Sequence, residues 1–312
     1  MSEAFREIVT LESPTGARLA LRHRPAEGAA RAVLLIAHGM AEHGARYERF
    51  AGAMAGHGLA VYAHDHRGHG KTTAADAPLG RFAARDGWRE VIEDVMAVRA
   101  HASARHPGLP IVLFGHSMGG LIAWNTMISH PRAFRAVAVW NANFDGGAAG
   151  RAAQAILAVE QAFKGSDVPS TMLSRLTFEA WGRTVKDRET LFDWLSHDRG
   201  IVRAYIDDPL CGFDCSVSMW RDVFAFVYRG GDSKNWAGMD RALPIHLVGG
   251  AEDPGTRGGA AVRRLGRDLE KAGFRDVECT VLEGFRHETL NEIGADRPIA
   301  GLMKWIDRVV TQ

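Results

Sequence analysis

Cysteine is scarce in this sequence: three cysteines in 312 residues are an odd number and do not make a disulfide framework. Cys211 and Cys215 lie four residues apart, but a zinc site would need further ligands close to them. We therefore expect unpaired, buried thiols, which are typical of proteins in a reducing compartment.

Long apolar runs are also missing. Residues 1–7 contain no apolar stretch of signal-peptide length, and no run elsewhere in the sequence approaches the length of a membrane span. The sequence thus predicts a cytoplasmic protein without an integral membrane segment, whose contact with lipid, if any, is peripheral.

The charges have no dominant sign. The sequence holds 38 Lys and Arg against 37 Asp and Glu, a net charge of +1, so no nucleic acid or acidic membrane surface is implied as a partner. Neither G-x-G-x-x-G nor G-x-x-x-x-G-K-[ST] follows a predicted strand, and nucleotide binding is not indicated. The expected partner is a small molecule, and no cofactor is expected.

The sequence does contain a regular alternation of short apolar runs and helical patterns. An opening hairpin is predicted first, and then strands and helices follow in turn, which is typical of an α/β protein with a mostly parallel central sheet and helices on both faces. The predicted strands are 7–11, 18–22, 32–37, 59–63, 111–114, 135–140, 244–248 and 277–282, and the predicted helices are 46–57, 87–104, 118–129, 259–272 and 297–310. Asp86 stands where it would cap the helix at 87–104.

The alternation stops between residues 145 and 240, which contain helical segments rich in large apolar residues but no buried-strand run. We predict a helical cap at 145–240, inserted between two parts of one core at 1–144 and 241–312. Most apolar side chains of the cap should pack it onto the core, and others should line a pocket. The candidates for contact with a substrate are Phe144, Trp181 and Trp194.

The pentapeptide Gly115-His116-Ser117-Met118-Gly119 joins a predicted strand to a predicted helix. A G-x-S-x-G motif in this context is typical of a nucleophile elbow, a tight turn that lifts the serine hydroxyl clear of the sheet. The first backbone N–H groups of the helix then point at whatever the hydroxyl attacks. Because the motif also occurs by chance, the serine needs partners elsewhere in the chain.

Two loops at strand ends supply such partners. Asp253 and His287 each follow a predicted strand, at the edge of the sheet where the elbow also lies. The chain order Ser117, Asp253, His287 is the nucleophile–acid–base order of this fold. We predict that His287 activates Ser117 and that Asp253 orients His287. Glu252 is the alternative acid, since an Asp before a Pro is also ordinary turn chemistry.

Two backbone N–H groups are expected to hold an oxyanion. One belongs to Met118, directly after the serine, and the other to Met40, in the loop after the strand at 32–37. The alternative reading of His38-Gly39 is a simple strand-to-helix turn.

The segment at 64–69, with His64, Asp65, His66 and His69, superficially resembles a metallohydrolase loop. Its carboxylate precedes the second histidine rather than the third, so the spacing does not favour a metal site. Glu42 and His43 are expected to brace a turn close to the predicted oxyanion loop, and the alternative is that they contact the substrate directly.

The chain resembles the α/β-hydrolase superfamily and, within it, the monoacylglycerol lipase and lysophospholipase-type serine hydrolases. The resemblance rests on residues 38–47, 65–70, 115–120, 253–254 and 284–288. It implies an α/β-hydrolase fold with a cap, and hydrolysis of a monoacylglycerol or lysophospholipid ester through an acyl-enzyme. One departure is Gly255, where relatives usually have a branched apolar residue.

Two alternative functions stay open. One is a general carboxylesterase or thioesterase that acts on soluble substrates. The other is a binding protein that keeps the fold without turnover, although such a protein has no need of Ser117, Asp253 and His287 together. The sequence leaves the oligomeric state and the head group of the substrate undetermined.

Overall fold

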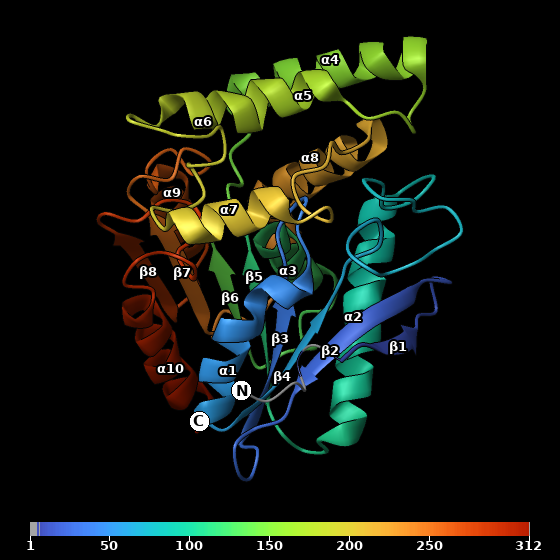
Figure 1. The fold of residues 1–312 in the computed structure, drawn as a ribbon. Coiled ribbons are helices and arrows are strands. Elements are labelled where there is room, and N and C mark those ends of the chain that lie inside the picture. The colour runs from blue at the N-terminus through green and yellow to red at the C-terminus, as the bar shows by residue number, and fades with distance from the viewer. Residues whose placement is uncertain (1–4, 6, 312) are drawn as a thin grey trace.

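An eight-stranded sheet forms the centre of the computed structural model, which describes residues 5 and 7–311 (Figure 1). The strand order is β1-β2-β4-β3-β5-β6-β7-β8. The pairs β1–β2 and β2–β4 are antiparallel, and every pair from β4 to β8 is parallel. The strands are β1 (Val9–Glu12), β2 (Arg18–Arg24), β3 (Ala32–Ala37), β4 (Leu59–His64), β5 (Ile111–His116), β6 (Ala136–Trp140), β7 (Ile245–Gly250) and β8 (Val277–Leu282). The predicted opening hairpin and mostly parallel sheet are confirmed.

Helices cover both faces of the sheet because successive residues of its buried strands point to opposite sides. Val33 and Leu35 of β3 belong to one apolar cluster, whereas Leu34 and Ile36 belong to the other. The first cluster is covered by α2 (Gly87–Arg105), α3 (Met118–Ser129) and α9 (Ala260–Lys271), and the second by α1 (Glu48–Gly56) and α10 (Asp296–Val310). A short turn of helix, η2 (Gly44–Tyr47), leads into α1.

Helices and loops, without a named strand, connect β6 to β7. They are α4 (Gly147–Lys164), α5 (Thr171–Ser174), η3 (Arg175–Glu179), α6 (Ala180–Thr184), α7 (Arg199–Asp207), α8 (Val217–Gly231) and η4 (Ser233–Trp236). In Figure 1, α4, α5 and α6 lie above the carboxyl ends of the parallel strands. The last long helix between β6 and β7 is α8, which packs against α3 and α2 and contributes to the first apolar cluster.

Asp86 does not cap α2 as predicted. Its φ is 48°, and its side chain makes no hydrogen bond to the first turn of the helix. The carboxylate of Asp222, in α8, accepts a hydrogen bond from the backbone N–H of Trp88 instead. A side chain from a distant helix thus replaces the local cap, which a pattern read along the chain does not reveal.

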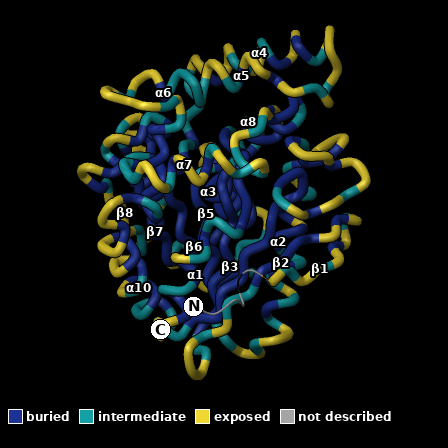
Figure 2. The backbone as a smooth tube through the Cα atoms, in the orientation of Figure 1, coloured by how far each residue is buried: buried dark blue, intermediate teal, exposed yellow. Residues whose placement is uncertain are grey.

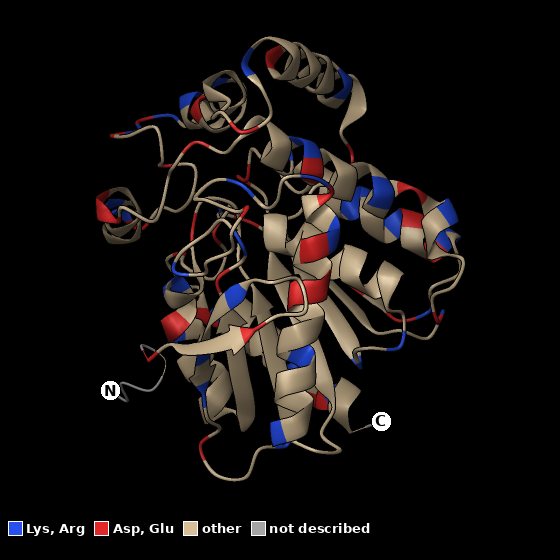
Figure 3. Cartoon of the chain, turned by 90° about the vertical axis from the view of Figure 1, so that its right-hand side faces the viewer, with Lys and Arg blue, Asp and Glu red and all other residues tan. Residues whose placement is uncertain are grey.

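Burial is concentrated in the central strands and in α3, while the outer helices, the loops and the edge strands β1 and β8 carry exposed residues (Figure 2). In the view of Figure 3, basic and acidic side chains are interspersed on these helices, in keeping with the small net charge. Within residues 5 and 7–311, no helix has the length and apolarity that a membrane span requires. All three cysteines are free, as predicted, but of the three Cys215 alone is buried: Cys211 is half-buried, and Cys279 is exposed on the edge strand β8.

Candidate active site

Ser117 occupies a sharp turn between β5 and α3. Its φ of 56° is a backbone conformation that residues other than glycine rarely adopt. The two glycines of the motif make this turn possible. A Cβ on Gly115 would lie 2.1 Å from the carbonyl oxygen of Gly119, and a Cβ on Gly119 would lie 2.0 Å from that of Ala37. The two glycines are therefore required for two reasons: the turn is tight, and the backbone packs closely against the end of β3.

The structure brings Ser117, His287 and Asp253 together at the carboxyl ends of the parallel strands. Nε2 of His287 lies 2.9 Å from Oγ of Ser117, and Nδ1 of His287 lies 2.8 Å from Oδ1 of Asp253. His287 and Asp253 are buried, with exposed fractions of 4% and 0%. Glu252, the alternative acid, pairs with His197 at 3.2 Å instead.

The Asp253 carboxylate is surrounded by donors that the sequence did not single out. Asn141 Nδ2 and Thr256 Oγ1 donate to Oδ2 at 3.1 and 2.8 Å, and the backbone N–H of Gly255 donates to Oδ1 at 2.8 Å. Burial on its own would raise the pKa of Asp253, but His287 and these donors outweigh it and hold the pKa below its ordinary value. Asp253 is therefore held as a carboxylate that can orient the imidazole.

Both predicted oxyanion donors lie beside the serine. Met118 is the first residue of α3, where backbone N–H groups have no partner within the helix. Met40 follows Gly39, which approaches the serine so closely that a Cβ on it would lie 3.4 Å from Cβ of Ser117. Met40 and Met118 line the same cavity as Ser117 and His287.

This cavity, of about 490 Å³, extends from Ser117 into the helices between β6 and β7. Trp181 lines it, as predicted for a residue that contacts substrate, but Phe144 and Trp194 are not among its lining residues. Phe144 instead packs against α8 at Gly230, and the ring of Trp194 lies 4.9 Å from the ring of His287. The apolar lining also includes Ile156, Leu173, Leu176, Phe178, Trp220, Val223 and Phe224.

A loop before α7 is attached to the loop of His287 through the backbone. The N–H of His287 donates to the carbonyl of Trp194 at 3.3 Å, and the N–H of Glu288 donates to the carbonyl of Leu195 at 2.7 Å. The segment between β6 and β7 thus holds the backbone of the predicted base as well as lining the cavity.

One group of described side chains has metal-ligand atoms close enough to share an ion: His43, Asp208 and Cys211, within 4.8 Å of one another. The arrangement does not favour a metal, because Nε2 of His43 already lies 2.9 Å from the Asp208 carboxylate. Burial also raises the pKa of the Cys211 thiol well above its usual range, which disfavours the thiolate that a metal binds.

A family model described as serine aminopeptidase, S33, matches residues 28–294 of the chain. The chain belongs to this α/β-hydrolase family. Two curated relatives are lipases. The monoacylglycerol lipase of Mycolicibacterium smegmatis is 28% identical over 278 residues, 88% of either chain. The human monoglyceride lipase is 33% identical over 130 residues, which cover 42% of this chain and 41% of that protein.

Solved structures of other proteins have the same fold as this chain. A thermostable carboxyl esterase from Bacillus coagulans matches with a TM-score of 0.87 and 21% identity, covering 97% of this chain and 98% of that one. A monoacylglycerol lipase from Paleococcus ferrophilus matches with a TM-score of 0.70 and 20% identity, covering 94% and 99%. The predicted fold and monoacylglycerol lipase-like family are confirmed, and the comparisons support the predicted enzyme class, a carboxylic ester hydrolase.

Proposed function

We propose that this protein is a serine hydrolase that cleaves carboxylic esters with an apolar acyl chain through an acyl-enzyme intermediate. The observation that carries the proposal is the 2.9 Å separation of Ser117 Oγ and His287 Nε2. A serine hydroxyl is a weak nucleophile on its own, and a base within hydrogen-bond reach is what activates it.

In the proposed reaction, Nε2 of His287 takes the proton of Ser117 while the hydroxyl oxygen attacks the ester carbonyl. The N–H groups of Met40 and Met118 bind the negative oxygen that forms. His287 then passes the proton to the leaving alcohol, and the acyl group stays on Ser117. Water, activated by His287, releases the acid, and Asp253 stabilises the imidazolium in both steps.

The apolar cavity supports an acyl chain as the part of the substrate that is bound. Phe178, Trp181 and Trp220 line it together with aliphatic side chains, and such a pocket gains affinity from the apolar area that a ligand buries. We further propose residues 145–240 as a cap on a core of 1–144 and 241–312. A monoacylglycerol or a lysophospholipid combines an apolar chain with an ester at one end and is the proposed substrate type.

An aminopeptidase reaction, which the family description also names, is less well supported. Such an enzyme needs an anionic group to bind the amino terminus of a peptide. Among the described residues that line the cavity, the one carboxylate is that of Asp145, and it is already paired. Asp145 pairs with Arg257 and Arg264 at 2.6 and 2.7 Å, and Asp253 pairs with His287.

A fluorophosphonate probe tests the nucleophile. We expect the wild-type protein to be labelled, and the Ser117→Ala variant to remain folded and unlabelled. A folded wild-type protein that is not labelled would favour the non-catalytic binder instead.

A panel of esters tests the substrate. Glycerol monoesters, lysophospholipids and p-nitrophenyl esters from acetyl to decanoyl are compared, with an aminoacyl-p-nitroanilide as the peptidase probe. We expect kcat/KM to rise with acyl length until the cavity is filled. Flat or falling values would favour the esterase or thioesterase of soluble substrates, and cleavage of the anilide alone would favour the peptidase.

A further inference from the structure

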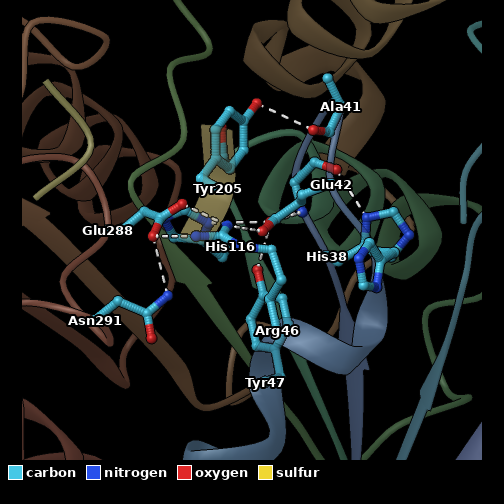
Figure 4. Close-up of polar contacts among 12 residues, drawn as sticks. His38, Ala41, Glu42, Arg46, Tyr47, His116, Tyr205, Glu288 and Asn291 are labelled. Atoms are coloured by element: carbon cyan, nitrogen blue, oxygen red, sulfur yellow. Dashed lines mark hydrogen bonds and ion pairs between the residues drawn. The ribbon is translucent and has the colours of Figure 1, made fainter. Parts of the chain in front are cut away.

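A buried cluster of charged side chains, drawn in Figure 4, contacts three loops of the proposed active site. Arg46 is its centre. The guanidinium donates to both oxygens of Glu288, at 2.6 and 2.8 Å, and also to the Glu42 carboxylate. These three side chains are 4% to 12% exposed. Two parallel hydrogen bonds from one guanidinium fix the position of a carboxylate more strictly than a single contact does.

Glu42 connects this cluster to the loop that carries Met40. Its Oε1 accepts hydrogen bonds from the backbone N–H of Gly39 and from the hydroxyl of Tyr47, the latter at 2.8 Å. Burial on its own would raise the pKa of Glu42, but the Arg46 charge and the hydrogen-bond donors outweigh it and hold the pKa well below its usual range. Gly39 is thus held by a charged acceptor one residue before the proposed oxyanion donor.

Glu288 connects the cluster to the proposed base, because it directly follows His287 in the chain. His116, the residue before the nucleophile, makes a further link. Its Nε2 donates to the carbonyl of His287 at 2.9 Å, while its Nδ1 lies 3.9 Å from Oε1 of Glu42. The elbow, the oxyanion loop and the base loop therefore each place a side chain or a backbone group on the same cluster.

Helix α7 and the loop that follows it also contact the oxyanion loop. The hydroxyl of Tyr205 donates to the carbonyl of Ala41 at 3.0 Å, and the N–H of Gly212 donates to the same oxygen at 2.9 Å. The Arg46 guanidinium lies 4.9 Å from the centre of the Tyr205 ring. The oxyanion loop is therefore held both by the cluster and by the segment between β6 and β7.

We propose that Glu42, Arg46, His116 and Glu288 form a positioning cluster. This cluster fixes the positions of the oxyanion loop, the elbow and the His287 loop relative to one another. The inference rests on the proposed function, since it assigns these residues a role in the reaction of Ser117. None of the four lines the cavity, so they act through Met40, Ser117 and His287 rather than on a substrate.

The test replaces Arg46 by Met, which keeps much of the volume and removes the three charged contacts. A displacement of reacting groups by about 1 Å costs on the order of a hundredfold in rate. We expect kcat on a p-nitrophenyl ester to fall by about that factor while KM changes by less than about threefold. The rate constant of fluorophosphonate labelling should fall in parallel. Arg46→Lys should recover part of the loss, because it keeps the charge but not the paired hydrogen bonds to Glu288.

Arg67→Met is the matched control. Arg67 is even more deeply buried, with 1% of its side chain exposed against 12% for Arg46, and it pairs with Asp94 at 3.1 Å, but its contacts lie with α2 and the β1–β2 turn. We expect this variant to lose thermal stability while kcat stays within about twofold of wild type. The pH dependence of kcat/KM is measured as well, because a displaced His287 changes it and a general loss of stability does not.

The inference is overturned if folded Arg46→Met keeps kcat within about twofold of wild type, or if it loses no more activity than Arg67→Met does. If Arg46→Met does not fold, Glu288→Gln replaces it, since this variant keeps an acceptor but removes one charge. An unchanged kcat in Glu288→Gln would then overturn the inference. A wild-type protein without fluorophosphonate labelling counts against the proposed function itself.

Discussion

Oδ1 of Asp253 lies 2.8 Å from Nδ1 of His287, whereas the neighbouring acid, Glu252, lies 3.2 Å from His197. Two consecutive carboxylates thus point to different histidines. Asp253 is fully buried, but the side chain of Glu252 is 51% exposed. Only Asp253 is placed to orient the imidazole beside Ser117.

Asp253→Asn should therefore lower kcat by about ten-thousand-fold and leave the fold intact, because an amide at this position favours the wrong tautomer of His287. Hydrolysis of a p-nitrophenyl ester measures the loss. Glu252→Gln is the control and should stay within about twofold of wild type. A large loss in Glu252→Gln with an active Asp253→Asn would reverse the assignment.

Gly119→Ala should prevent correct folding around the elbow. The new Cβ would lie 2.0 Å from the carbonyl oxygen of Ala37, a backbone atom that has no freedom to move inside the sheet. We expect little soluble protein, and a melting temperature far below wild type in what is recovered. Gly52→Ala, where a Cβ meets open space in α1, should be neutral or stabilise by up to about 1 kcal/mol. A well-folded Gly119→Ala would contradict the packing argument.

Acid should destabilise the protein through its buried histidines. Burial lowers the pKa of His64 and His69 from 6.5 to about 4. Between these values the unfolded chain binds protons that the folded protein does not. The free energy of unfolding should thus fall as the pH decreases through this window, by up to about 1.4 kcal/mol per pH unit for each histidine.

Urea unfolding at several pH values measures this slope. His64→Phe, which removes one buried titrating ring, should make this slope shallower than in the wild type. Equal slopes in wild type and His64→Phe would contradict the assignment.

The titration of Asp222 should change the free energy of unfolding in the opposite direction, lowering it as the pH rises. Burial raises its pKa from 3.8 to about 7, so the folded protein holds this proton more tightly than the unfolded chain does. The contribution of Asp222 to stability is present at low pH and is lost as the pH rises from 3.8 to 7.

Asp222→Asn keeps an oxygen that accepts from the N–H of Trp88 and removes the charge. We expect it to melt at a higher temperature than wild type above pH 7, with the difference vanishing near pH 4. The exposed Asp214→Asn serves as the control. A lower melting temperature for Asp222→Asn above pH 7 would show that the charge stabilises the end of α2.

Trp181→Ala should weaken the binding of long acyl chains, because Trp181 lines the cavity and its ring lies 6.2 Å from that of His287. Removing a large apolar contact costs about 1.5–3 kcal/mol, or roughly tenfold or more in KM for a decanoyl ester. Phe163→Ala, on the outer face of α4 with 86% exposure, should leave KM unchanged. Equal KM values for Trp181→Ala and wild type would remove Trp181 from the substrate pocket.

Ser117, Asp253 and His287 could be predicted because each follows a strand, and the carboxyl ends of parallel strands meet at one edge. The position of each residue is then set by the sheet rather than by details of its loop. The same regularity explains why the bounds of the central strands and helices agree with the prediction to within a few residues.

The supporting contacts could not be predicted in this way. Arg46 and Glu288 are 242 positions apart, and Asn141 reaches Asp253 across 112 positions. These pairs depend on how loops fold back over the sheet, and no local pattern marks them. Asp86 failed as a cap for the same reason, since Asp222 in α8 occupies its place.

The backbone pairing of Trp194 and Leu195 with His287 and Glu288 has a consequence for exchanging parts between members of this family. A chimera that replaces everything between β6 and β7 would carry away two acceptors of the histidine loop and the Tyr205 contact to Ala41. A graft limited to residues 147–184 would transfer α4, α5 and α6 and leave those anchors in the recipient. If the proposed function holds, such a graft would transfer the acyl preference while the recipient keeps its own turnover chemistry.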